Sequence, residues 1–536
     1  MEGINEEMQH LRFKASELLL REEWNDSINA YSQFISLCHQ HLSDSDTLKG
    51  ESGAADQTSK LTKSLCLAFS NRAEAQYRLR DFSGALVDCD RALEIDSTHC
   101  KSLICKGRIL LDLDRYSKSL DCFRRALELQ ISGGCENLHG FLDRCKKLEF
   151  QSRTGAFDLS DWVLNGFHGK SPELAEYVGP VQIKRSENCG RGLFATKDLE
   201  AGTLLIMTKP VAIGRAILPE PGDDSGDCAR MVMWKDFVNK ILDAAKRCRK
   251  TLQLIYALST GEDEEGLEVP DLNLFRPETE ESCFSEEKPD MGRILKILDV
   301  NSLTEDGTCA KTLGKKSGFY GVGLWILASF VNHSCNPNAR RLHIGDHMAI
   351  HASRDVKAGE EITFAYFDVL EPLKKRRELS KTWGFYCKCK RCRFEKEISY
   401  SEELREIEMG LENESEMGEI VVRLEERMRR WMVKGKEKGF LRASFWEAFS
   451  GVLKSERLMR RWGRRVPAAE MVAESVAEAV GGDERVVKVV VDTWKKGGVV
   501  VDMERAMRLG RGVYGKMMRK KAIRALLELG ICEQSY

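Results

Sequence analysis

The decisive stretch of the sequence is Phe330-Val331-Asn332-His333-Ser334-Cys335-Asn336-Pro337-Asn338. It gathers an amide, an imidazole, a hydroxyl, a thiol and an Asn-Pro-Asn turn directly after an apolar, helix-forming run that begins at Gly318. Buried polar groups cost free energy unless they are paired, so this density of polar groups predicts a functional site. An Asx-Pro turn beside a core histidine would use the same residues. The stretch alone does not separate these interpretations, and two downstream segments favour the site.

The first of these segments is the cysteine cluster Cys387-x-Cys389-x-x-Cys392. A closed structural zinc site needs four ligands, and this cluster supplies three. The fourth candidate is Cys335, the thiol inside the decisive stretch. Three reduced surface cysteines at this spacing would be an oxidation liability, so a zinc site is the favoured interpretation. The second segment, Glu361–Tyr366, alternates like a strand and ends in a tyrosine.

The overall composition is that of an ordinary globular protein. The chain has 536 residues, of which 42% are hydrophobic and 31% charged, and its length predicts about two to four domains. A formal net charge of −1 gives no overall attraction to nucleic acid or to an anionic membrane. The sequence contains neither a signal-peptide pattern nor a run of about 18 apolar residues. We therefore expect reduced cysteines, no membrane association, and residence in the nucleus or the cytoplasm.

An internal repeat organises residues 8–150. The aromatic, small and aliphatic positions of Arg80–Ile95 recur 34 residues later, in Asp114–Leu129. This period resembles the tetratricopeptide repeat, in which two antiparallel helices pack through small residues. An earlier copy begins at Glu23, and its wider spacing predicts a mobile loop over Ser43–Lys60. Cys135–Phe150 is expected to form a capping helix.

The repeats allow two roles. A solenoid presents a concave surface that could bind a protein or peptide partner, or it could be a purely structural platform for the next domain. We slightly favour the binding role.

The pattern changes after the repeats. Residues 151–178 have mixed polarity and several glycines, and they are predicted to be a linker. Short β-like runs follow at Val181–Lys184, Leu204–Met207 and Pro210–Ile213. Between the first two runs, Gly190-Arg191-Gly192 fits either a β-turn or a backbone loop that closely approaches a small cofactor.

Two helical regions complete the chain. An insert over about 220–317 could line a substrate entrance or be a surface insert with no direct role. Residues 400–536 are helical by pattern. Basic clusters such as Lys516–Lys521 accompany neither a helix-turn-helix nor a zinc-finger pattern, so direct nucleic-acid binding is not indicated.

Five motifs occur together in the order found in one family, the SET domain. They are Gly190-Arg-Gly-Leu-Phe-Ala195, Gly321-Val-Gly-Leu324, Asn332–Asn338, Glu361–Tyr366 and Cys387-x-Cys-x-x-Cys392. The sequence over about 179–395 therefore resembles a SET domain, and its long insert is most similar to the SMYD branch. The insert lacks the Cys/His-rich MYND finger of that branch. With the repeats at its N-terminus, the chain looks like a TPR–SET protein.

The resemblance implies a multidomain α+β architecture. It consists of an α-solenoid over 8–150, a β-rich knotted SET fold over 179–382, a zinc-bound post-SET flap over 383–395, and a helical region over 400–536. The implied activity is protein-lysine N-methylation, in which S-adenosylmethionine donates a methyl group to a lysine of a histone or non-histone protein. The alternative is an interaction scaffold whose SET module is inert or only binds the cofactor.

The resemblance also implies roles for individual residues. Tyr366 corresponds to the catalytic tyrosine, whose hydroxyl orients the amine and the methyl group. A structural zinc would be held by Cys335, Cys387, Cys389 and Cys392. Trp383 could wall the lysine channel as a cation–π partner. The implied cofactor contacts are Gly190, Arg191, Gly192, Asn301, Asn332, His333, Tyr366 and Phe385.

Overall fold

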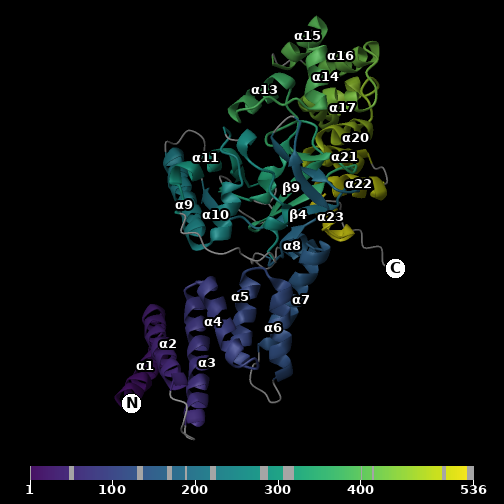
Figure 1. Cartoon of the computed structure of the whole chain (residues 1–536). Coiled ribbons are helices and arrows are strands. Elements are labelled where there is room, and N and C mark those ends of the chain that lie inside the picture. Colours follow the sequence, from purple (N-terminus) through teal and green to yellow (C-terminus); the bar gives the residue numbers. More distant parts are fainter. Residues whose placement is uncertain are drawn as a thin grey trace, which may run out of the picture. The chain divides into compact units, whose positions relative to one another are not determined.

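The computed structural model divides the chain into two compact units, Met1–Phe150 and Gln151–Tyr536 (Figure 1). No helix in the described part of the chain is long and apolar enough to cross a membrane. The structure describes residues 2–47, 54–129, 137–165, 172–187, 190–217, 225–262, 264–277, 288–305, 319–399, 401–412, 416–497 and 502–527.

The first unit consists of helices that pack as consecutive antiparallel pairs (Figure 1). Glu22, Arg80 and Asp114 follow the first helix of each pair and share a left-handed backbone, with φ of 63°, 61° and 59°. Because the last two lie 34 residues apart, the backbone repeats with the sequence period. The helices are α1 (Glu2–Leu20), α2 (Trp24–Thr47), α3 (Ala54–Arg78), α4 (Phe82–Ile95), α5 (Cys100–Asp112), α6 (Tyr116–Leu129) and α7 (Leu138–Thr154).

The predicted loop over Ser43–Lys60 is wrong for most of its length. Helix α2 continues to Thr47, and α3 already begins at Ala54, while residues 48–53 lie outside the described part. Leu42 and Leu61, at the edges of the polar stretch, pack against the apolar core formed mainly by α1, α2 and α3. The expected capping helix is α7, and Cys135 lies outside the described residues.

The described residues of the predicted linker, 151–165 and 172–178, instead belong to the second unit. They contain the short helix α8 (Ser160–Asn165), and their Phe157, Leu159 and Trp162 are buried in that unit's largest apolar core. The backbone N–H of Leu159 donates to the carbonyl of Met517 at 2.8 Å. Glycines and mixed polarity suggested a linker, but the apolar partners of this segment come from the C-terminal helices.

The second unit is built around three small sheets. The first has the order β1 (Tyr177–Val178), β4 (Leu204–Thr208), β10 (His347–Ala352) and β9 (Ala339–Ile344). The second has the order β2 (Val181–Arg185), β3 (Arg191–Ala195), β11 (Glu361–Phe364) and β8 (Asn332–His333). The third has the order β5 (Ile213–Ile217), β7 (Phe319–Gly323) and β6 (Leu303–Thr304).

Two local predictions in this region are wrong. The strand expected at Pro210–Ile213 begins only at Ile213 and runs to Ile217, where it pairs with β7. The run expected to form a helix before Phe330 forms strand β7, and only a short 3₁₀ turn, η4 (Leu327–Phe330), follows it. Pairing of β7 with both β5 and β6 outweighs the local preference of this run.

The insert is helical, as predicted. It contains α9 (Ser225–Arg247), α10 (Arg249–Tyr256) and α11 (Met291–Asn301), with 3₁₀ turns η2 (Glu264–Gly266) and η3 (Leu272–Phe275). Residues 218–224, 263, 278–287 and 306–318 of this region lie outside the described residues.

Helices also form most of the chain after β11. α13 (Leu373–Thr382) and α14 (Lys390–Ile398) flank the cysteine cluster. The C-terminal region is helical, as expected from its pattern. Its helices are α15 (Glu402–Glu412), α16 (Met417–Arg430), α17 (Lys436–Ser444), α18 (Trp446–Lys454), α19 (Glu456–Trp462), α20 (Ala469–Val480), α21 (Glu484–Gly497), α22 (Met503–Tyr514) and α23 (Lys520–Leu526).

The turn between α20 and α21 packs against the Asn336-Pro337-Asn338 turn. Asn336 Nδ2 donates to the carbonyl of Ala479 at 2.6 Å, and Arg340 Nη1 donates to the carbonyl of Gly482 at 2.7 Å. A Cβ atom on Gly481 would lie 2.8 Å from the Pro337 carbonyl oxygen. The C-terminal helices thus support the position of this turn.

Replacing Gly481 with alanine should therefore destabilise the protein more than Gly359→Ala. Both glycines have positive φ, 74° and 82°, where alanine costs about 1–2 kcal/mol. Gly359 has no atom within 4 Å of its Cβ position, whereas Gly481 would clash with Ser353 and Pro337. We expect urea unfolding to show an additional loss of at least about 1 kcal/mol for Gly481→Ala. Equal losses would contradict the close packing of this turn.

His351 should make the protein less stable in acid. Its side chain is buried in β10, where Nε2 donates to the Gly512 carbonyl, and burial together with Arg340 lowers the pKa of His351 to about 3. An unfolded histidine has a pKa of about 6.5, so the stabilisation is complete above that pH and is lost as the pH falls toward the folded value. The loss should be about 1.4 kcal/mol per pH unit.

Urea unfolding as a function of pH measures this contribution. Below pH about 6.5, the unfolding free energy of His351→Gln should fall less steeply than that of the wild type. The exposed His10 provides the control, and His10→Gln should keep the wild-type slope. An unchanged slope in His351→Gln would contradict the assignment.

Candidate active site and metal centre

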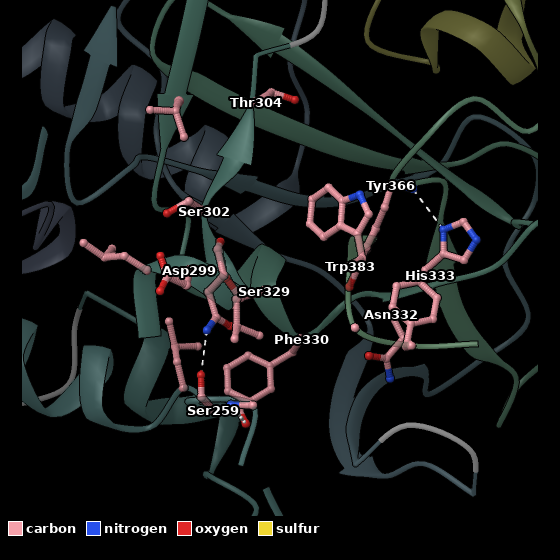
Figure 2. A pocket seen from close by; sticks show the side chains of 18 of the residues that line it. Ser259, Asp299, Ser302, Thr304, Ser329, Phe330, Asn332, His333, Tyr366 and Trp383 are labelled. Atoms are coloured by element: carbon pink, nitrogen blue, oxygen red, sulfur yellow. Dashed lines mark hydrogen bonds between the residues drawn. The ribbon is translucent and has the colours of Figure 1, made fainter. Parts of the chain in front are cut away.

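A cavity of about 770 Å³ lies within the second unit (Figure 2). Its walls come from the insert, from β7 and η4, from the β8–β11 region and from the segment after α13. Among the residues predicted from sequence, the lining includes Arg191, Asn301, Asn332, His333, Tyr366, Trp383 and Phe385.

The central feature of the cavity is the pairing of β8 with β11. The two strands run parallel, with Asn332 opposite Thr363 and His333 opposite Phe364. Tyr366 follows β11, and its backbone N–H donates to His333 Nδ1 at 3.0 Å (Figure 2). Segments more than thirty residues apart in sequence thus place an imidazole and a phenol side by side, with ring centroids separated by 5.4 Å.

The Tyr366 side chain is fixed at both ends. Its hydroxyl donates to the carbonyl of Val331 at 2.9 Å. Its ring lies 5.2 Å from Trp383 and 6.1 Å from Phe385, centroid to centroid. Because the single phenolic proton is used by Val331, the oxygen can act toward any further partner only as an acceptor.

Asn301 is located at the end of α11, in the cavity wall. Its Nδ2 donates to the carbonyls of Ser259 and Ile297, both at 2.8 Å. This amide connects the loop after α10 to the last turn of α11, and its side chain is buried. The structure therefore brings Asn301 to the same cavity as Asn332, despite the long intervening segment.

Arg191 holds the insert against the cavity. Its buried guanidinium pairs with Glu264, with Nε–Oε1 and Nη2–Oε2 distances of 2.7 and 3.0 Å, and Nη1 donates to the carbonyl of Ala257 at 2.7 Å. Gly190 has a φ of 61°, and a Cβ there would lie 2.3 Å from the Glu264 side chain. Sequence reasoning missed Glu264, because nothing near it in sequence indicates its partner.

Glu361 is a second residue that sequence reasoning missed. Its Oε1 accepts a hydrogen bond from Asn332 Nδ2 at 2.8 Å. Gly192 lies against this pair rather than in the cavity wall, since a Cβ there would be 2.4 Å from Glu361 Oε1. The acidic pair at the start of β11 was the available signal, but acidic residues beside a turn are ordinary.

The four predicted metal ligands come together. Cys335, Cys387, Cys389 and Cys392 place their sulfur atoms within 4.8 Å of one another. A tetrahedral zinc with bonds of about 2.3 Å separates its sulfur ligands by about 3.8 Å, so the cluster has the right size and donor chemistry. Interactions among the four thiols lower the pKa of Cys335 well below its usual range, with help from His333 and against burial, and they raise the pKa of Cys387 and Cys392. These residues therefore fit a structural zinc ion.

Buried charges surround the cluster. Arg376 Nη1 donates to Cys392 Sγ at 3.2 Å, and the same guanidinium pairs with Glu395. Arg391 pairs with Glu395 at 2.7 Å and donates to the carbonyl of Cys335 at 3.2 Å. Cationic donors beside ionised sulfur stabilise the thiolate form that a metal requires.

Comparison with known proteins identifies the class of the central region. Residues 190–367 match the family model of the SET domain. These residues contain the cavity's Asn332, His333 and Tyr366. The central region is therefore a SET domain, and with the helix pairs of the first unit it gives the chain a TPR–SET architecture. The predicted multidomain α+β fold is confirmed.

Similar sequences are methyltransferases by name. A protein called "Methyltransferase" from Gibberella zeae is 26% identical over 352 residues, which are 61% of this chain and 46% of that protein. Human histone-lysine N-methyltransferase SMYD3 is 42% identical over 73 residues, 13% of this chain and 17% of that protein. The chain thus spans less than half the length of these relatives.

Several solved structures are similar to parts of this chain, and one of them is a tetratricopeptide-repeat domain. The TPR domain of Arabidopsis OM64 has 23% identity and covers 26% of this chain and 96% of its own, with a TM-score of 0.21. The 34-residue period and the helix pairs, rather than this similarity, support the repeat architecture.

The metal centre can be tested by zinc content. Cys335→Ser and Cys389→Ser should each lose most of the zinc bound per chain, because three thiolates no longer close a tetrahedral site. Cys228→Ser removes an exposed thiol of the insert and should keep it. Elemental analysis of the purified variants measures this, and unchanged zinc in Cys335→Ser would exclude Cys335 as the fourth ligand.

Proposed function

We propose that the protein transfers a methyl group from S-adenosylmethionine to the side chain of a lysine in another protein. The observation that carries the proposal is the convergence of Asn332, His333, Tyr366 and Phe385 on one cavity within the SET domain. The methyltransferase names of the similar sequences support the same reaction class.

The cavity residues suit an amine nucleophile. A lysine in water has a pKa of about 10.4, so the site must favour its neutral form. The rings of Tyr366, Trp383 and Phe385 form an apolar wall that disfavours the ammonium ion. The oxygen of Tyr366, held by its bond to Val331, can accept an N–H of the amine and point the nitrogen lone pair along one direction.

The polar side of the cavity suits the donor. Bound there, S-adenosylmethionine would supply an electrophilic methyl group on a sulfonium sulfur. Asn301 and Asn332 would provide polar groups for its amino-acid and ribose portions, and Phe385 would offer a ring for the adenine. His333 lines the same cavity, with both ring nitrogens already bonded within the protein. Arg191 acts indirectly by holding the insert in place.

Zinc is proposed to have a structural role. His333 Nε2 lies 3.3 Å from Cys335 Sγ, so the cavity and the cysteine cluster share a hydrogen bond. A bound metal would fix the segment that carries Trp383 and Phe385, because Cys387 follows it directly.

An interaction scaffold is the alternative function. The helix pairs expose apolar side chains, among them Phe13 and Leu20 of α1, and we propose that the first unit binds a protein or peptide partner. Binding of S-adenosylmethionine without methyl transfer to any protein would favour the scaffold. We further propose residence in the nucleus or cytoplasm, since the cysteines of the described part are not joined by disulfides.

The Tyr366→Phe variant tests the reaction. It removes the oxygen that orients the amine, so methyl transfer should fall about a hundredfold. Incorporation of radiolabelled methyl into proteins of a cell extract measures the change. Tyr386→Phe removes a hydroxyl from an exposed ring near the cysteine cluster and serves as the control. Equal labelling by wild type and Tyr366→Phe would contradict the role of Tyr366.

A further inference from the structure

Glu361 connects two segments beside the cavity. It is the first residue of β11, and its two carboxylate oxygens have different partners. Oε1 accepts from Asn332 Nδ2 at 2.8 Å, and Oε2 accepts from Ser186 Oγ at 3.0 Å. Asn332 lies on β8 and Ser186 directly follows β2, so one half-buried carboxylate fixes an amide of the cavity wall to the neighbouring hairpin.

These contacts determine how the Asn332 amide is oriented. Besides Glu361, Asn332 Nδ2 has a second acceptor, the carbonyl of Arg191 at 3.1 Å. An ionised carboxylate and a backbone carbonyl can only accept, so the NH₂ end of the amide must face both. Figure 2 shows the amide oxygen of Asn332 on the side of Phe330, with the nitrogen turned away. Asn332 therefore presents its amide oxygen, a hydrogen-bond acceptor, to the cavity rather than its NH₂ group.

Gly192 makes this pair possible. A Cβ atom there would lie 2.4 Å from Glu361 Oε1 and 3.0 Å from Asn332 Nδ2, which is too close for either atom. The second glycine of Gly190-Arg191-Gly192 thus acts on the cavity through Glu361 and Asn332.

We propose that Glu361 is a positioning residue for the methyl donor. It holds the Asn332 amide so that Oδ1 accepts a hydrogen bond from the ammonium group of the donor's amino-acid portion. The inference rests on the proposed function, because it requires the donor to bind in this cavity. An ammonium ion has only donors, so a rotated amide would present N–H groups to a cation. Loss of a charge-assisted hydrogen bond of this kind weakens binding about tenfold or more.

Two substitutions of Glu361, by side chains of similar length, separate the effect of its hydrogen bonds from the effect of its volume. Glu361→Gln keeps an oxygen for Asn332 and offers an N–H to the Ser186 hydroxyl. Glu361→Met fills the space but offers no comparable acceptor. The matched control is Glu360→Gln, since the Glu360 carboxylate bonds to Asn338 and Arg354 instead. The full-length proteins are titrated calorimetrically with S-adenosylhomocysteine, and their melting temperatures are recorded.

We expect Glu361→Met to raise the dissociation constant at least tenfold, while Glu361→Gln and Glu360→Gln stay within about threefold of the wild type. In methyl transfer, Glu361→Met should raise the KM for the donor more than it lowers kcat. Binding by Glu361→Met within twofold of the wild type would overturn the inference and leave the proposed function standing. Failure of the wild type to bind would instead contradict the proposed function.

Folding and mechanism have their own controls. If Glu361→Met does not fold, Glu361→Gln decides, since retained binding supports the inference and a tenfold loss overturns it. In a folded protein, adding Glu361→Met to Asn332→Ala should weaken binding no further, because Glu361 acts through that amide. Additive losses would show that it acts by another route.

Discussion

The parallel pairing of β8 with β11 is the constraint on which the site depends. It joins only two residues of each strand, Asn332 to Thr363 and His333 to Phe364. Because it fixes the relative register of two distant segments, it also decides that Tyr366 reaches His333. Cys335 lies two residues beyond His333, where the chain meets the cysteine cluster. One short ladder therefore positions the cavity and the proposed metal centre together.

The imidazole of His333 shows how closely these two centres are joined. Its Nδ1 accepts from the backbone N–H of Tyr366, so in the neutral ring the proton is on Nε2. Nε2 then donates to Cys335 Sγ at 3.3 Å. A single ring thus connects the backbone of the proposed catalytic tyrosine to a proposed zinc ligand. Such second-layer contacts orient ligands and tune their charge in metal sites.

The C-terminal helices support this centre from the other side. Asp368, just after Tyr366, pairs with Arg485 of α21 at 2.6 Å. Burial would raise the pKa of Asp368, but the Arg485 guanidinium and the Leu370 N–H lower it on balance. The carboxylate therefore stays ionised, and α21 remains attached beside the cavity.

The sequence by itself determined the features that depend on local pattern. The 34-residue period predicted the helix pairs, and cysteine spacing together with the polar stretch around Asn332 predicted the four thiols that the structure brings together. Only the tertiary structure decided the roles of Glu264 and Glu361 and the burial of Trp162 in the supposed linker. The reason is physical. Glu264 bonds to Arg191 and Glu361 bonds to Asn332, which lie 73 and 29 residues away in the chain. A local sequence pattern does not indicate which distant residue a side chain will contact.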